Sequence, residues 1–121
     1  MGYKLSKITE NIMRLDLIGD FDAEDASNYP AQLMPYLENA AAHGEQLHIY
    51  VDTSEFGSLS VAGRRVFSEA NKDERQGKIA ASGVNRFLGM MARFIMVASG
   101  RDNIRFFDDE NSALEWLKGS D

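Results

Sequence analysis

The chain contains no cysteine among its 121 residues. This absence excludes disulfides, thiolate metal ligands and a cysteine nucleophile, and it suits a reducing compartment, so we expect a cytoplasmic protein. Long uncharged apolar runs are also missing, and the first residues contain no apolar stretch typical of a signal peptide. We therefore expect no segment that spans a membrane or directs secretion.

Positive charge is scarce, because 13 Lys and Arg residues stand against 19 Asp and Glu residues, for a net charge of −6. An acidic surface repels a phosphate backbone, so nucleic acid is not an expected partner. Hydrophobic residues make up 44% of the chain, which is typical of a folded globular protein. The length fits a single domain, which we expect to cover residues 1–121.

Hydrophobic periodicity divides the chain into strands and helices. Alternating or short apolar runs predict strands at residues 3–8, 11–18, 47–52, 78–82 and 103–107. Helical spacing predicts four helices. The first follows Asp22 as its N-cap, and the second runs from Ser60 to about residue 73. The third occupies 86–99 after a cap at Asn85, and the fourth starts at 108–110. Because Pro30 and Pro35 each lack a backbone donor, we expect a break or kink and a main helix at 31–43. Residues 53–59 are expected to form a loop.

The strand patterns also predict a topology. Two of the strands alternate apolar and polar residues, whereas strands of a parallel sheet covered on both faces are apolar throughout. Right-handed crossovers between neighbouring strands place the helices on one face. We therefore expect an α/β fold with a small mixed, mostly parallel sheet of about five strands in near-sequential order, with helices mainly on one face and 3–8 as an antiparallel edge.

Catalytic and metal-binding patterns are weak in this sequence. The serines form no nucleophile elbow, and His43 and His48 have no evident nucleophile in reach. The spacing of Asp20, Asp22 and Asp25 fails the calcium-loop pattern at its sixth and twelfth positions, so helix capping is the better interpretation. We assign no catalytic residue, metal or cofactor, and expect that the protein is not an enzyme.

Two segments resemble the SpoIIAA-like family of the STAS superfamily. Residues 100–117, GRDNIRFFDDENSALEWL, are similar to the closing strand and helix of the family, and residues 33–40, LMPYLENA, resemble its proline-marked helix. The resemblance implies a β–α superhelix, likened to the lipid-carrying CRAL-TRIO domain, and no enzyme activity. It also implies action through protein partners, with phosphorylation of a serine in an Asp-Ser-Ser-Gly-type loop in some members.

The corresponding loop here is residues 52–60, DTSEFGSLS, which lacks that motif. Ser58 and Ser60 are the candidate switch residues, and because the motif is incomplete we expect no phosphorylation. Ligand or membrane association is therefore the stronger of the ideas that the resemblance suggests.

The helix expected at 86–99 has an unusual outer face. Its inner face should hold Phe87, Leu88, Met91, Phe94, Ile95 and Ala98. The opposite face carries a candidate interaction patch of Arg86, Met90, Arg93, Met96 and Val97. An ordinary surface helix would be polar there, so either neighbouring elements cover the patch, or the segment is a strand, or a partner binds it.

Three functions remain open at this point. The first is a non-catalytic binding module, expected to be a homodimer, that takes an apolar small molecule or a membrane surface. The second is a partner-switching regulator that docks on an anti-sigma protein. The third is an unrecognised enzyme, which would need converging titratable groups.

Overall fold

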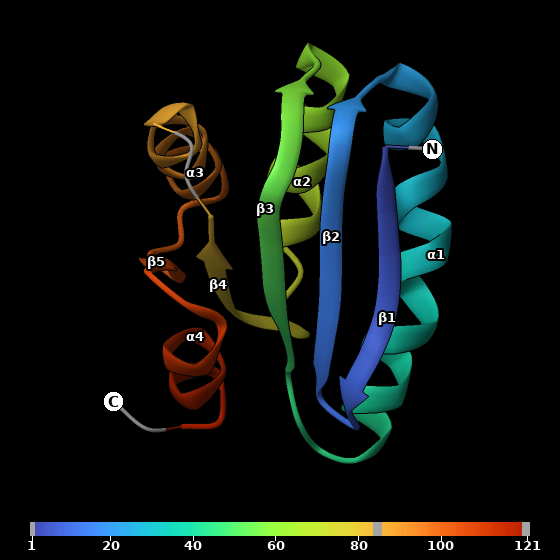
Figure 1. Cartoon of the computed structure of the whole chain (residues 1–121). Helices are drawn as coiled ribbons and strands as arrows, with labels where there is room; N and C mark the ends of the chain where they lie inside the picture. The colour runs from blue at the N-terminus through green and yellow to red at the C-terminus, as the bar shows by residue number, and fades with distance from the viewer. Residues whose placement is uncertain (1, 84–85, 120–121) are drawn as a thin grey trace.

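The computed structural model describes residues 2–83 and 86–119, so the predicted cap Asn85 lies outside the described residues. Five strands form one sheet in the order β1-β2-β3-β4-β5 (Figure 1). Their bounds are Tyr3–Thr9, Ile12–Phe21, Leu47–Leu59, Gln76–Ser82 and Ile104–Phe107. Strand β1 is antiparallel to β2, and the remaining neighbours are parallel. The predicted α/β class, strand order and antiparallel edge are confirmed.

Four helices cover the sheet unequally. They are α1 (Ala23–Ala42), α2 (Val61–Asn71), α3 (Arg86–Ser99) and α4 (Glu110–Leu117). Figure 1 shows α1 and α2 behind β1–β3, and α3 and α4 beside the β4–β5 end. Helices α1 and α2 pack on the face that carries Met13, Leu15 and Ile49, whereas α4 packs on the opposite face, against Ile12 and Tyr50. The prediction of helices mainly on one face is confirmed, with α4 as the exception.

Helix α1 runs without interruption through both prolines, so the predicted break and the predicted start near residue 31 are wrong. Pro30 and Pro35 are both exposed, and each ring faces solvent. The opposite side of the helix buries a stripe that includes Tyr29, Leu33 and Leu37. Burial of three large side chains outweighs the hydrogen bonds that the prolines cannot make.

Residues 53–59 are part of β3 and not the predicted loop. They pair with the far end of β2, for example Ile18 with Glu55 and Phe21 with Leu59. Register shifts between Asp16 and Ile18 and again at Gly19 interrupt the apolar alternation of this pair. A pattern that depends on strict alternation therefore misses the extension.

The caps and the final helix follow the sequence closely. Ser60 caps α2 by accepting the Gly63 N–H at 3.0 Å. Asp109 caps α4 by accepting the Ser112 N–H at 2.8 Å. Trp116, on α4, is buried, with its ring centroid 5.6 Å from that of Phe107.

Candidate functional site

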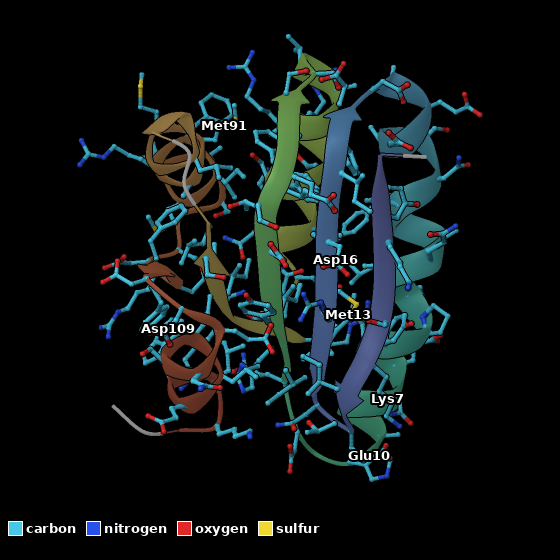
Figure 2. The ribbon with its side chains drawn as sticks, in the orientation of Figure 1. Lys7, Glu10, Met13, Asp16, Met91 and Asp109 are labelled. Atoms are coloured by element: carbon cyan, nitrogen blue, oxygen red, sulfur yellow. The ribbon has the colours of Figure 1, made fainter. Side chains whose placement is uncertain are left out.

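An apolar cavity lies between the sheet and the helices α2 and α3. Its volume is about 90 Å³, and its walls come from the shared helical face of the sheet and from both helices. Leu15, Ile49 and Ala81 line it from the sheet, and Phe67 lines it from α2. Met91, labelled on α3 in Figure 2, belongs to the same lining. Protein interiors contain few voids larger than a water molecule, so this space requires an explanation.

Small side chains of the lining contribute to the space. Ala81 on β4 and Ala92 on α3 are both buried and both line the cavity. Each offers a single methyl group where larger apolar residues would fill the space between helix and sheet. Tyr29, Thr53 and Gln76 are the residues of the lining that carry polar side-chain groups. The Thr53 hydroxyl already donates to the Ser82 carbonyl at 2.8 Å.

The titratable groups gather on the other face of the sheet, around Arg14. Its guanidinium donates to Asp16 at 3.0 Å, to Asp52 at 2.9 Å and to Glu110 at 2.8 Å. Asp16 is labelled on β2 in Figure 2. Partial burial alone would raise the pKa of Asp52, but hydrogen bonds from Ser54 and the charge of Arg14 lower it. The three carboxylates share one cation, an arrangement that fastens α4 to β2 and β3.

The aspartates near the start of α1 form caps, which confirms the capping interpretation. Asp22 accepts the Asp25 N–H at 2.9 Å, and Asp25 accepts the Asp22 N–H at 3.1 Å. Asp25 also accepts the backbone N–H of Gly2 at 3.2 Å. In residues 2–83 and 86–119, no group of three or more His, Asp or Glu side chains has the geometry to hold a metal ion.

The two histidines make local hydrogen bonds. His43 at the end of α1 bonds through Nδ1 to the Asn39 carbonyl at 2.8 Å. His48 Nδ1 accepts the Lys78 N–H at 2.9 Å, at the point where the pairing of β3 with β4 shifts register. A Cβ atom on Gly77 would lie 2.5 Å from that nitrogen, so the ring and the glycine fit only together. Burial, reinforced by the charge of Lys78, lowers the pKa of His48 and keeps the ring neutral.

Ser58 and Ser60 lie close together, near the end of β3 and the start of α2. The exposed Ser58 hydroxyl donates to Asp20 at 2.8 Å. The Ser60 hydroxyl is engaged as the α2 cap. Both candidate switch residues therefore lie just before the N-terminus of α2.

The outer face of α3 is apolar and exposed over much of its length. The side chains of Met90 and Val97 are 72% and 77% exposed, and together with Arg93 and Phe94 they line a shallow groove. Met96 is half-buried beside them, and the side chain of Arg86 lies outside the described residues. The structure thus brings Met90, Arg93 and Val97 together on one surface.

The inner face of α3 differs from the prediction at two of its described positions, and the side chain of Phe87 lies outside the described residues. Phe94 and Ala98 are exposed, whereas Ala92 is buried in their place. The helix is rotated so that Phe94 lies at the seam with α2, where the Arg64 guanidinium lies 5.4 Å from its ring centroid. This contact between helices could not be read from the periodicity of α3 alone.

The SpoIIAA-like family matches residues 12–118, which is most of the chain. The chain belongs to the SpoIIAA-like family. The resemblance noted in the sequence is therefore confirmed. No curated protein matches the chain.

Solved structures of low sequence identity share this SpoIIAA-like fold. An uncharacterised DUF3478-family protein from Shewanella loihica PV-4 is 19% identical, with 95% of this chain and 91% of that chain covered and a TM-score of 0.64. The unphosphorylated anti-sigma factor antagonist SpoIIAA is 12% identical, with 97% and 98% covered and a TM-score of 0.66. Phosphorylated SpoIIAA from Bacillus is 14% identical, with 95% and 98% covered and a TM-score of 0.55. Within the described residues of this chain, every helix is too short or too polar to cross a bilayer.

The neutral state of His48 makes the stability of this SpoIIAA-like domain depend on pH. Because the folded pKa lies below the unfolded value of about 6.5, the unfolded chain takes up the proton first. Stability is complete above that value and is lost as the pH falls toward the folded pKa. We expect His48→Asn, which keeps an acceptor for Lys78 but does not titrate, to lose less stability than wild type over this window in urea denaturation. Equal losses in the two proteins would contradict the assignment.

Proposed function

We propose that the protein is a non-catalytic binding module that holds a small apolar ligand between the sheet and α3. The apolar cavity of about 90 Å³ is the observation that carries this proposal. Apolar cavities of this kind stay dry and take up apolar molecules, because water gains no hydrogen bonds from their walls. The charged groups on the opposite face are paired with one another, so they support the fold better than they support catalysis.

The size of the cavity limits the ligand. An engineered cavity of roughly 150 Å³ admits benzene, so the space here holds a short alkyl segment, or a single ring once α3 moves outward slightly. Glycines with positive φ stand on both sides of α3, Gly83 at 131° and Gly100 at 71°. Left-handed backbone at both ends gives the helix two points at which a small displacement could be absorbed.

The ligand proposal predicts a variant that folds but does not bind. Ala92→Leu adds three carbon atoms to the cavity, and cavity-filling changes commonly add about 0.5–2 kcal/mol of stability. We expect native mass spectrometry of freshly purified wild type to show a retained small molecule, and Ala92→Leu to lack it. Ala98→Leu makes the same change at an exposed position of α3 and should keep the ligand. If wild type, like Ala92→Leu, is observed only at the mass of its own polypeptide with no retained molecule, the proposal fails.

The exposed face of α3 is best suited to a second copy of this chain. Met90, Phe94 and Val97 form an apolar strip, and Arg93 is the cation beside it. Two copies can bury these strips against each other and remove them from water. Methionine suits such a contact because its side chain adapts its shape. The proposed assembly is a homodimer through α3.

Two acidic substitutions test the dimer. Met90→Asp combined with Val97→Asp places charge on the strip, and we expect analytical ultracentrifugation to give a dimer for wild type and a folded monomer for the variant. Met34→Asp, at an exposed methionine of α1, is the matched control and should remain dimeric. A monomeric wild type, or a dimeric double variant, rules out this interface. Liposome binding that is lost only in the double variant would favour a membrane instead.

A partner-switching regulator is the second candidate function. Ser60 lies at the start of α2, next to a groove that contains Val61, Arg64 and Phe94. A phosphate at a helix N-terminus is favoured by the helix dipole, and a solved neighbour, SpoIIAA from Bacillus, is known in a phosphorylated form. The loop of this chain departs from the family motif, which ranks the switch below ligand binding. The same mass spectrum would reveal an added phosphate group if Ser58 or Ser60 were modified.

A further inference from the structure

One residue of the cavity lining carries a buried acceptor that no described residue uses. Gln76, the first residue of β4, is 2% exposed and lines the cavity. Its amide nitrogen donates to Asn71 Oδ1 at 2.9 Å. Among the described residues, its Oε1 atom has no hydrogen-bond partner. A buried carbonyl oxygen that has lost its water without gaining a donor weakens the fold, so such atoms are rare and call for an explanation.

A chain of amides fixes which atom of Gln76 is left over. The Asn103 amide nitrogen donates to the Gly77 carbonyl at 2.7 Å, and a backbone carbonyl can only accept. The orientation of Asn103 is therefore set, and its nitrogen also donates to Asn71 Oδ1 at 2.8 Å while its oxygen accepts from Asn71 Nδ2 at 3.1 Å. Asn71 Oδ1 must then be an acceptor toward Gln76 as well. Gln76 therefore donates to Asn71 Oδ1 through Nε2, and Gln76 Oε1 is the atom that Asn71 does not bind.

The backbone around this amide chain is held in place. Arg101 Nη1 donates to the carbonyls of Asn71 at 3.1 Å, Asp73 at 3.2 Å and Gln76 at 2.6 Å. One guanidinium thus joins the end of α2 to the start of β4. These bonds fix the backbone of Gln76, and its side chain is held by the hydrogen bond to Asn71.

A donor for this oxygen has to suit a lining that is almost entirely apolar. Besides Gln76, its polar side chains are Thr53, whose proton is already used on Ser82, and Tyr29, so a lone water would find few of the two to four polar partners it needs. A charged donor would enter a lining that contains no carboxylate, at a large desolvation cost. A neutral donor attached to an apolar body matches both the oxygen and the walls around it.

We infer that the ligand is a neutral, mainly apolar molecule with one hydrogen-bond donor, such as a phenol or an alcohol, and that Gln76 Oε1 accepts that donor. This inference rests on the proposed function, because it specifies what occupies the same cavity. Gln76 then sets the orientation of the ligand, with its polar end at the start of β4 and its apolar body toward Ala81 and Ala92. A site built in this way rejects an analogue that lacks the donor, because the oxygen then stays unsatisfied.

Phenol and toluene test the inference, since they have nearly the same shape and differ by a hydroxyl in place of a methyl group. Gln76→Met keeps the length of the side chain and removes the acceptor. We expect the preference for phenol over toluene, measured by calorimetric titration, to fall about tenfold from wild type to Gln76→Met, equivalent to about 1.4 kcal/mol. The same preference in both proteins overturns the inference while the proposed function stands. If neither compound binds to wild type, the inference fails, whereas the proposed function is tested separately by the mass spectra of wild type and Ala92→Leu.

A second readout needs no variant and decides the question if Gln76→Met does not fold. In wild type labelled with ¹³C, a hydrogen bond to Oε1 shifts the side-chain carbonyl resonance of Gln76. We expect this shift on addition of phenol and a much smaller one on addition of toluene. Equal shifts with the two compounds would show that Gln76 Oε1 does not accept a hydrogen bond from the phenol hydroxyl, and would overturn the inference.

Discussion

The apolar face of β2, β3 and β4 must be covered by helices. Where α3 covers it, the side chains are too small to fill the space between helix and sheet. Ala81 and Ala92 each provide only a methyl group to the lining there, and the remaining space is a cavity of about 90 Å³. A fold that loses dispersion contacts in this way gives up stability, since cavities cost free energy in proportion to their volume. An occupant that restores those contacts is the physical reason to read the cavity as a binding site.

The two faces of the sheet have different roles in this account. On the face of α4, Arg14 joins β2, β3 and α4 through three carboxylates, so charge is used to fix the architecture. On the other face the walls are mainly apolar, and the amide oxygen of Gln76 has no donor among the described residues. Separation of charge from the cavity leaves apolar surroundings there, which strengthen any hydrogen bond made inside it. The outer side of α3 then remains available for a second copy of the chain.

The sequence was sufficient for the topology and insufficient for the site. Strand order, the antiparallel edge and the helical nature of 86–99 follow from apolar periodicity, and Met90 and Val97 are exposed as their spacing predicts. The extension of β3 depends on register shifts opposite β2, and the uninterrupted α1 depends on burial that outweighs two prolines. Gln76 gives no signal in the sequence, because its role comes from Asn71 and Asn103, which reach it from other elements.

Xenon tests most directly whether the space beneath α3 is a binding cavity. The atom is apolar, binds dry cavities without needing a donor, and is located without ambiguity in a crystal held under xenon pressure. The account predicts a xenon site between Ala81 on β4 and Ala92 on α3, absent in Ala92→Leu. A wild-type crystal with no xenon at that position would contradict the central claim that this SpoIIAA-like domain holds an apolar ligand there.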